Sequence, residues 1–249
     1  NFAPDENVDI SYTGYTFTDW NWSAIGDKMP ARDVTVLAQW QINTYKIAFN
    51  ENGGSDVADI ETTYGSSTNF SGETTKSGYE FEYWYLDDEN TEFQIPLDMP
   101  ALDELYGSSE ITLNAKWTVK SYTITFESKG GSAVENITAN YGDEIAAPAD
   151  PELKGYTFDY WYLSDVNTPF VFDSTMPALD DLYGSKEITL NAKWTVKTIT
   201  ITFDSNGGSA VDPIVLNYGD YIANRPADPT MEGYTFTGWT LDGESYIIP

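Results

Sequence analysis

Polar and apolar residues alternate most clearly in the middle of the chain. The segment 122–126 alternates Tyr, Ile and Phe with threonines. A period of two with β-branched and aromatic residues predicts a half-buried strand. The Gly130-Gly131 pair supplies positions for positive φ, and the apolar run 134–137 follows it. Together these segments predict a β-hairpin that ends at Tyr141-Gly142.

The next residues predict one short helix and two further strands. The segment 147–155 predicts a short helix, because it has an Asp that can cap the helix, a Pro for the first helical position and a Gly at the end. The segment 155–163 predicts a strand with large residues on both faces, which a central strand or a β-bulge explains. A second helical turn is possible over 176–184, between a Pro and a Gly. Alternation over 188–194 predicts the closing strand.

This pattern is repeated along the chain. The Gly-Gly pairs and the tryptophans at 40, 117 and 194 return every 77 residues, and about half of the positions of the two full copies are identical. These identities fall mostly on residue types that set packing and turns, so we expect them to be structural. The recurring motif residues are Gly53, Gly54, Gly130, Gly131, Gly207, Gly208, Trp40, Trp117, Trp194, Trp84, Trp161 and Trp239.

The period divides the chain into four parts. They are a first partial repeat (1–40) matching the later part of a unit, a second repeat (41–117), a third repeat (118–194) and a last partial repeat (195–249) that matches the earlier part. Because the sequence starts and stops inside a repeat, we expect it to be an excerpt from a longer array. A permuted domain that exchanges strands with its neighbour would give the same sequence pattern. We expect stiff junctions, an extended array on the order of 90 Å long and a mainly β fold with short helices (α+β).

Composition narrows the function. The 249 residues contain 12 Lys and Arg, 40 Asp and Glu, no His and no Cys, for a formal net charge of -28. Nucleic-acid binding and membrane-surface binding are therefore disfavoured. Ser-His-Asp and Cys-His catalysis, Cys/His zinc sites and disulfides are excluded. No stretch is long and apolar enough for a membrane span, and we expect neither a signal peptide nor an anchor in this piece.

The ordered motifs Tyr-x-Ile-x-Phe-x-x-x-Gly-Gly, Gly-Tyr-x-Phe-x-x-Trp-Tyr and Leu-x-Ala-x-Trp resemble the internalin B-type B repeat, or Listeria–Bacteroides repeat. Segments 122–131, 155–163 and 188–194 carry the pattern best. The resemblance implies a β-grasp-like module of tandem arrays in bacterial cell-surface and secreted proteins, with no catalytic residues. This sequence departs from the pattern in its acidity and in an insertion before the last strand, Met-Pro-Ala-Leu-Asp-Glu-Leu-Tyr-Gly.

Clustered carboxylates suggest a metal site only weakly. Calcium prefers several oxygen ligands, and Asp87, Asp88, Glu89 and Asp165 could supply some of them. No EF-hand or Gly-Gly-x-Gly-x-Asp spacing accompanies them, so a solvated acidic loop is the default expectation. Paired acids could also catalyse glycoside hydrolysis, but adjacent acids are expected by chance in so acidic a chain. We therefore expect no enzyme and no cofactor.

Tyrosines outside the motif positions are the better candidates for a contact surface, because exposed aromatic rings anchor interfaces and stack on sugars. The candidates are Tyr83, Tyr85, Tyr106, Tyr160, Tyr162 and Tyr183. The periodic tryptophans are expected to pack in the core instead.

Three functions remain open. The preferred one is a non-enzymatic extracellular array, a stalk or adhesive segment of a large bacterial surface protein, whose partners are other repeats and a host or cell-surface protein or glycan. The first alternative is a self-assembling structural protein of a filament or surface layer, in which neighbouring copies complete each other's strand edges. The second is a carbohydrate-binding module.

Overall fold

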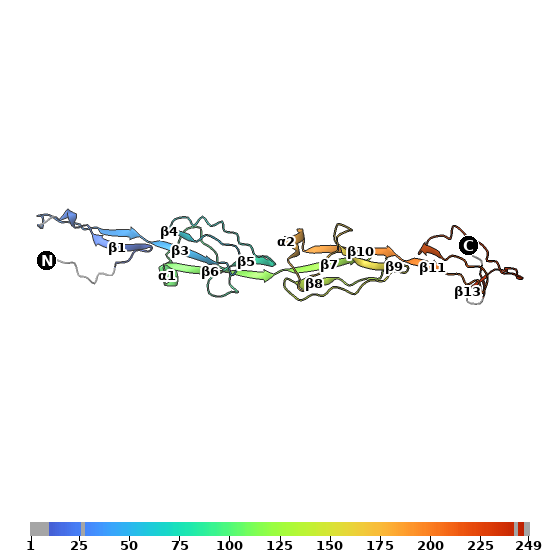
Figure 1. Cartoon of the computed structure of the whole chain (residues 1–249). Helices are drawn as coiled ribbons and strands as arrows, with labels where there is room; N and C mark the ends of the chain where they lie inside the picture. The colour runs from blue at the N-terminus through green and yellow to red at the C-terminus, as the bar shows by residue number, and fades with distance from the viewer. Residues whose placement is uncertain (1–9, 26–27, 242–243, 247–249) are drawn as a thin grey trace. The chain divides into compact units, whose positions relative to one another are not determined.

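The computed structural model describes residues 10–25, 28–241 and 244–246 of the chain (Figure 1). The chain divides into two compact units, residues 1–120 and 121–249. Each unit contains one complete four-stranded sheet together with part of a second module.

The second repeat forms its sheet in the order β4-β3-β6-β5 (Figure 1). Strand β3 pairs with β4 antiparallel and with β6 parallel, and β6 pairs with β5 antiparallel. The closing strand β6 therefore lies between β3 and β5, although it comes last in the sequence. The elements are β3 (Thr44–Asn50), β4 (Ile60–Thr63), β5 (Tyr79–Tyr85), α1 (Leu102–Tyr106) and β6 (Glu110–Val119).

The third repeat has the same arrangement, with the order β8-β7-β10-β9. Its closing strand β10 pairs parallel with β7 and antiparallel with β9. The predicted hairpin, the predicted closing strand and the helical turn before that strand are confirmed. The elements are β7 (Ser121–Glu127), β8 (Ile137–Asn140), β9 (Tyr156–Tyr162), α2 (Leu179–Tyr183) and β10 (Glu187–Val196).

The helix predicted over 147–155 is wrong. Residues 147–153 are irregular, and a turn follows at 154–155. The backbone N–H of Ser132 donates to the carbonyl of Glu152, and the N–H of Glu152 donates to Ser132 Oγ, both at 2.9 Å. These bonds satisfy the N–H and C=O groups of Glu152 without a helix. Pro148 and Pro151 also lack N–H donors for a helical ladder.

Each strand of the Gly-Tyr-x-Phe motif contains the β-bulge that the sequence suggested. The register of β5 against β6 shifts between Phe81 and Tyr83, and that of β9 against β10 skips Asp159. The extra residue changes which side chains face inward, so both Phe158 and Trp161 contact the core although they lie three residues apart.

The core of each complete repeat consists of the alternating residues of the two central strands. In the second repeat Tyr45 and Ile47 of β3 and Leu113 of β6 are essentially inaccessible. Tyr122, Ile124 and Leu190 repeat this arrangement in the third repeat. The closing strand therefore supplies much of the apolar surface that holds each module together.

The partial repeats form smaller sheets. In the first, β1 pairs antiparallel with β2, and a 3₁₀ turn, η1, lies between the two strands in the sequence. In the last, β11 pairs with β12 and β13 pairs with β14, both antiparallel. The elements are β1 (Tyr15–Trp20), η1 (Trp22–Ala24), β2 (Ala38–Ile42), β11 (Thr198–Ile201), β12 (Ile214–Asn217), β13 (Trp239–Leu241) and β14 (Glu244–Tyr246).

Candidate contact surfaces and repeat junctions

The insertion before the closing strand folds as a short helix fixed to the core. Leu102, the first residue of α1, is fully buried, and Tyr45 Oη of β3 donates to Asp103 Oδ1 at 2.6 Å. Gly107 ends the helix in the left-handed conformation, with φ of 73°. This anchoring leaves Leu105 and Tyr106 on the surface.

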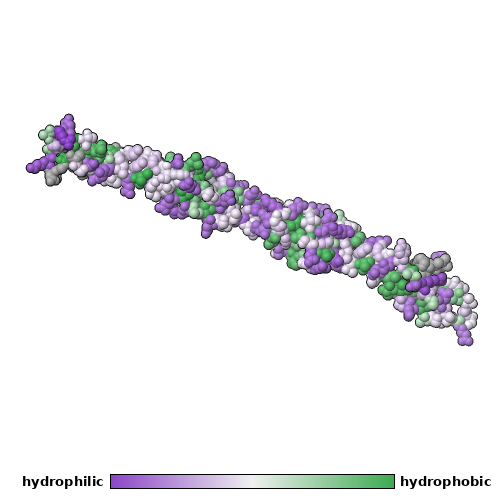
Figure 2. Space-filling view, turned by 90° about the horizontal axis from the view of Figure 1, so that it is seen from above, coloured by the Kyte–Doolittle hydropathy of each residue, from purple (hydrophilic) through white to green (hydrophobic). Residues whose placement is uncertain are grey.

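The third repeat builds the same surface. Tyr122 Oη donates to Asp180 Oδ1 at 2.5 Å, and Leu179 is fully buried. Leu182 and Tyr183 are exposed in the positions of Leu105 and Tyr106, and the exposed fractions of Tyr106 and Tyr183 are 45% and 44%. The two complete repeats thus each present a Leu-Tyr pair to solvent. Figure 2 shows hydrophobic residues in several separate patches among hydrophilic and intermediate ones.

Burial changes the acidity of the two anchoring tyrosines. Desolvation and the hydrogen bond to Asp103 raise the pKa of Tyr45 above its ordinary value. Desolvation and the hydrogen bond to Asp180 raise the pKa of Tyr122 in the same way. The neutral phenol is therefore the form that the folded module stabilises.

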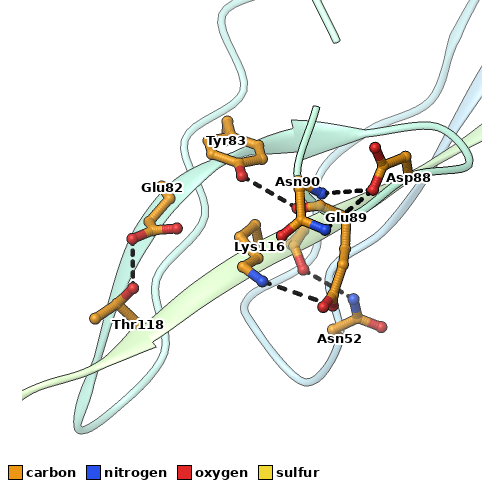
Figure 3. Close-up of polar contacts among 9 residues, drawn as sticks. Asn52, Glu82, Tyr83, Asp88, Glu89, Asn90, Lys116 and Thr118 are labelled. Carbon is orange, nitrogen blue, oxygen red and sulfur yellow. Dashed lines mark hydrogen bonds and ion pairs between the residues drawn. The ribbon is translucent and has the colours of Figure 1, made fainter. Parts of the chain in front are cut away.

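A polar face lies on the edge strand β5 and the closing strand β6 of the second repeat (Figure 3). Tyr83 Oη donates to the carbonyl of Glu89 at 3.1 Å, and Lys116 Nζ lies 3.6 Å from Glu89 Oε2. Asn52 Nδ2 donates to the carbonyl of Ala115 at 2.8 Å. The loop after β5 is thereby held over β6.

The third repeat keeps the hydrogen bond from the tyrosine but lacks the carboxylate of Glu89. Tyr160 Oη donates to the carbonyl of Val166 at 3.1 Å. Val166 stands at the position of Glu89, so Lys193, the counterpart of Lys116, has no carboxylate at that position. The predicted surface tyrosines Tyr83, Tyr85, Tyr160 and Tyr162 are half-buried, whereas Tyr106 and Tyr183 are exposed.

The calcium candidates lie in these loops and take part in local turns. Asp88 accepts from the Asn90 N–H and from Thr91 Oγ1, both at 3.0 Å, and these bonds lower the pKa of its carboxyl. Asp165 accepts from the Asn167 N–H at 2.9 Å and Thr168 Oγ1 at 2.8 Å, with the same effect on its pKa.

The other two candidates do not add to a cluster. Asp87 is exposed, and Glu89 faces Lys116. Within residues 10–25, 28–241 and 244–246, no three or more Asp or Glu residues are grouped so that they could hold a metal ion. The expectation of a solvated acidic loop, with calcium only as a weak alternative, stays a prediction.

The motif tryptophans have two roles. Trp84, Trp161 and Trp239 are at least nine-tenths buried in their modules. Trp117 and Trp194 are half-buried and donate from Nε1 to the carbonyls of Glu51 and Ser128, at 2.8 and 2.9 Å. Trp40 of the first partial repeat is half-buried and packs edge-on against Phe17.

The Gly-Gly pairs combine a turn with a close approach to these rings. Gly53, Gly130 and Gly207 have φ between 87° and 96°, the left-handed region that favours glycine. The second glycine has a different constraint. A Cβ on Gly54 or Gly131 would lie 2.5 Å from Cζ2 of Trp117 or Trp194, whereas Gly208 has no such ring contact.

A junction that sequence reasoning missed joins the first partial repeat to the second repeat. The backbone N–H of Asn43 donates to the carbonyl of Gly14 at 2.9 Å. The Tyr64 ring covers Gly14 so closely that a Cβ there would overlap it, and Tyr15 packs edge-on against Tyr64. Gly14 has φ of 76°, so both conformation and space require glycine.

In residues 121–249 the same kind of junction joins the third repeat to the last partial repeat. The N–H of Lys197 donates to the carbonyl of Gly155 at 2.9 Å, and the Tyr218 ring covers Gly155. Tyr156 packs edge-on against Tyr218. The recurrence of Tyr-Gly and Gly-Tyr was the available signal, but no local rule pairs the two motifs.

This recurrence of modules and junctions agrees with the comparison against protein families. The model of the Listeria-Bacteroides repeat domain matches residues 45–116, 122–193 and 200–246. The chain belongs to this family. The resemblance inferred from the motifs is therefore confirmed, and so is the mainly β architecture with short helices.

Three relatives of this chain are much longer proteins. A protein named as a Gly-rich membrane protein of Evansella cellulosilytica is 34% identical over 250 residues, covering 96% of this chain and 27% of the relative. Another protein of that organism, named as a membrane protein, is 35% identical over 209 residues, covering 84% of this chain and 30% of the relative. Internalin H of Listeria monocytogenes is 34% identical over 125 residues, covering 48% and 20%.

The chain spans less than a third of the length of each of these relatives. Among the described residues, no helix has the length and apolar character needed to cross a membrane.

Proposed function

We propose that this chain is a non-enzymatic stalk segment of a large extracellular bacterial surface protein. Its role is to hold other parts of that protein away from the cell wall, with adhesive contacts made along the stalk. Membership of a family that includes part of an internalin, and likeness to proteins named as membrane proteins, support a surface location.

The repeated junction is the observation that carries the stalk function. A single residue, Asn43, separates β2 from β3, and Lys197 alone separates β10 from β11. Each of these residues is itself hydrogen-bonded to the glycine of the preceding module. A tyrosine ring then covers that glycine, so rotation at the junction would break a backbone hydrogen bond and an aromatic contact together.

Composition suits an exposed segment of this kind. The net charge of -28 makes copies of the chain repel one another and keeps the surface solvated. The Leu105–Tyr106 and Leu182–Tyr183 pairs are the surfaces that we assign to adhesive contacts, because they are the exposed members of the predicted tyrosine set and its neighbours.

Display on a Gram-positive cell tests the stalk function. The chain is placed between a wall anchor and a terminal epitope, and antibody binding to the epitope is measured by flow cytometry. A linker of Gly and Ser with the same number of residues is the comparison. We expect more antibody bound with the chain than with the linker, because the modules resist collapse toward the wall. Equal binding with the two spacers would contradict the proposal.

Variants displayed in the same way separate junction stiffness from spacing. The variant Tyr64→Ala/Tyr218→Ala removes both covering rings and should lower antibody binding toward that of the linker. Tyr221→Ala is the matched control, because Tyr221 is 94% exposed. Equal surface expression of all the displayed proteins is checked with a second epitope next to the anchor.

A further inference from the structure

A groove lies along the outer edge of the sheet in the second repeat. The sheet ends at β4, which pairs with β3 on one side only. Residues 57–62 form one wall of the groove and residues 67–72 form the other, around a volume of about 370 Å³. All of these residues lie inside the unit 1–120 and inside the second repeat (41–117). The groove is therefore a feature of a complete module.

The segment that follows β4 turns away from that strand. The N–H of Thr68 donates to the carbonyl of Leu97 at 2.9 Å. The N–H of Met99 donates to the carbonyl of Ser66 at 2.8 Å. Beyond the turn that ends β4, the chain is therefore bonded to this distant segment, and a space remains beside β4.

The backbone of β4 has one unpaired side. The N–H of Lys46 donates to the carbonyl of Ser109 at 3.0 Å, which directs the backbone of Lys46 toward β6. The register places Glu61 opposite Lys46, and opposite residues of an antiparallel pair direct their backbone groups either both toward each other or both away. The N–H and C=O of Glu61 therefore point away from β3, and no residue in the described part of the chain is bonded to them. An added strand can pair with these two groups.

The groove offers apolar contacts to the side chains of such a strand. Ile60 and Phe70 line it, and the Phe70 ring stacks on Phe49 with the two ring centroids 5.0 Å apart. The two walls meet where Gly72 lies against Val57, because a Cβ on Gly72 would be 2.5 Å from Val57 Cγ1. Small apolar side chains such as Val therefore suit the residues of an added strand that face the groove.

The opposite face of this edge is acidic. Lys46 Nζ lies 3.0 Å from Asp59 Oδ2 and 3.1 Å from Glu110 Oε1, so two carboxylates share one ammonium group. Glu61, opposite Lys46 in the strand pair, adds a third carboxylate. A strand that carries Lys or Arg on this face therefore supplies the charge that the edge lacks. A second copy of β4 would bring Glu61 close to another Glu61, so charge disfavours pairing between copies of the chain.

The third repeat has the same edge without these carboxylates. Strand β8 is the outer strand there. Asn136 and Thr138 stand at the positions of Asp59 and Glu61. Thr138 Oγ1 lies 3.0 Å from Thr123 Oγ1, so two hydroxyl groups meet where the second repeat has charged groups. The acidic edge is therefore a property of the second repeat.

We propose that the β4 edge binds an extended basic segment of another protein, which adds a strand to the sheet. The segment runs antiparallel to β4 and exchanges backbone hydrogen bonds with Glu61. Its alternate residues direct small apolar side chains into the groove, and the residues between them direct Lys or Arg toward Asp59 and Glu61. This site is separate from the Leu105–Tyr106 surface, and it does not depend on the proposed stalk function.

Peptide binding to the full chain tests the proposal. A fluorescein-labelled peptide of sequence TKVKVKVT, in which Lys and Val alternate with the period of a strand, is titrated with the chain, and fluorescence anisotropy is measured. We expect saturable binding at one site per chain. The peptide TKKKVVVT has the same composition and charge without the alternation, and should bind at least about tenfold more weakly, because Lys would have to enter the groove. No saturable binding of the first peptide, or equal binding of the two, would overturn the proposal.

Two chain variants with the same net charge locate the site. Glu61→Lys should weaken binding of TKVKVKVT at least about fivefold, because it replaces attraction by repulsion. Glu135→Lys makes the same change of charge at an exposed position of the third repeat and should leave this binding unchanged. The acidic peptide TEVEVEVT should in turn bind Glu61→Lys more tightly than Glu135→Lys. Equal behaviour of the two variants toward both peptides would overturn the proposal.

Hydrogen exchange gives a readout that does not depend on the variants. We expect TKVKVKVT to slow exchange of backbone amides in β4 of the unmodified chain, including that of Glu61, and to leave the amides of β8 unchanged. Equal protection of β4 and β8, or no protection of β4, would overturn the proposal.

Light scattering separates this partner from a second copy of the chain. We expect the average mass of the chain without peptide to be the same for Glu61→Lys and for Glu135→Lys at every concentration. A mass that Glu61→Lys alone changes would overturn the proposal, because it would show that β4 pairs copies of the chain.

Discussion

Gly54 lies directly under the edge of the Trp117 ring, so that a Cβ at this position would be 2.5 Å from Trp117 Cζ2. The same indole donates from Nε1 to the Glu51 carbonyl in the turn before the glycine. The turn after β3 and the closing strand β6 are therefore locked together through one side chain. Gly131 and Trp194 repeat this relationship in the third repeat.

Substitution Gly54→Ala should therefore destabilise the second repeat. The methyl group would overlap both Trp117 and Thr74 Oγ1, which lies 2.6 Å from the Cβ position, so the ring must move. We expect a loss of about 1–3 kcal/mol in the free energy of unfolding, measured by urea denaturation.

Gly65→Ala is the control for backbone strain alone. Its Cβ position has no atom within 4 Å, but its φ is 70°. We expect it to cost about 1–2 kcal/mol through the left-handed conformation only. Both variants are also made in a chain that carries Trp117→Phe. In that chain the loss in free energy of unfolding caused by Gly54→Ala should be smaller, whereas the loss caused by Gly65→Ala should be unchanged. A Gly54→Ala cost unaffected by Trp117→Phe would contradict the contact.

The anchoring tyrosines predict a loss of stability at alkaline pH. The pKa values of Tyr45 and Tyr122 are raised above 10.0 in the folded state, so between pH 10 and the folded values the unfolded chain releases protons that the folded chain retains. The free energy of unfolding must then fall as pH rises through this range. Below about pH 10 the contribution of these two phenols is complete.

The variant Tyr45→Phe/Tyr122→Phe checks this pH dependence. Phenylalanine does not ionise, so the decline of stability above pH 10 should be shallower than in the unmodified chain. At pH 7 each substitution should cost about 1–3 kcal/mol, because Asp103 and Asp180 lose a donor. Urea denaturation at pH 7 to 11 measures both effects, with Tyr221→Phe as the control. Parallel pH profiles for all three proteins would refute the assignment.

Salt should stabilise the chain. The acidic groups exceed the basic groups by 28, and self-repulsion in the compact state is screened by added ions. A rise from 10 to 300 mM NaCl should increase the midpoint of thermal unfolding. The partly exposed pairs of Lys46 with Asp59 and Glu110, at 3.0 and 3.1 Å, are weakened by the same salt but contribute little. A lower midpoint at high salt would contradict this balance.

Calcium should add nothing beyond this screening. The oxygens of Asp88 and Asp165 already accept hydrogen bonds from their own turns. We therefore expect CaCl₂ and MgCl₂ at equal ionic strength to shift the thermal midpoint equally. An additional shift with calcium that Asp88→Asn removes would establish a calcium site in that loop.

Short-range patterns predicted the strands well because their alternation repeats the burial of the folded sheet. Tyr122 and Ile124 alternate with half-buried threonines and are themselves almost inaccessible in the structure. The bulge was one of two explanations that the sequence offered for large residues on both faces of 155–163, and the register shift in β9 confirms it. The ubiquitin-like, β-grasp comparison stays a prediction.

Long-range contacts were not predictable in the same way. The helix predicted over 147–155 failed because Ser132, far away in the sequence, satisfies the backbone of Glu152. The pairs Tyr45–Asp103 and Gly14–Tyr64 also join residues that lie 58 and 50 positions apart in the sequence. Their residue types recur with the period, but the sequence does not say which recurring residue touches which.

The stiffness of the junction is the central claim, and its most direct test is the distance between two spin labels across it. The chain contains no cysteine, so Gln39→Cys and Thr112→Cys, both at exposed strand positions, can be labelled without background. Double electron–electron resonance then gives the distance distribution between β2 and β6. We expect a narrow distribution that broadens with Tyr64→Ala and does not change with Tyr106→Ala. If the distance distribution of the unmodified chain were already as broad as that of Tyr64→Ala, the proposed stiffness of the junction would be contradicted.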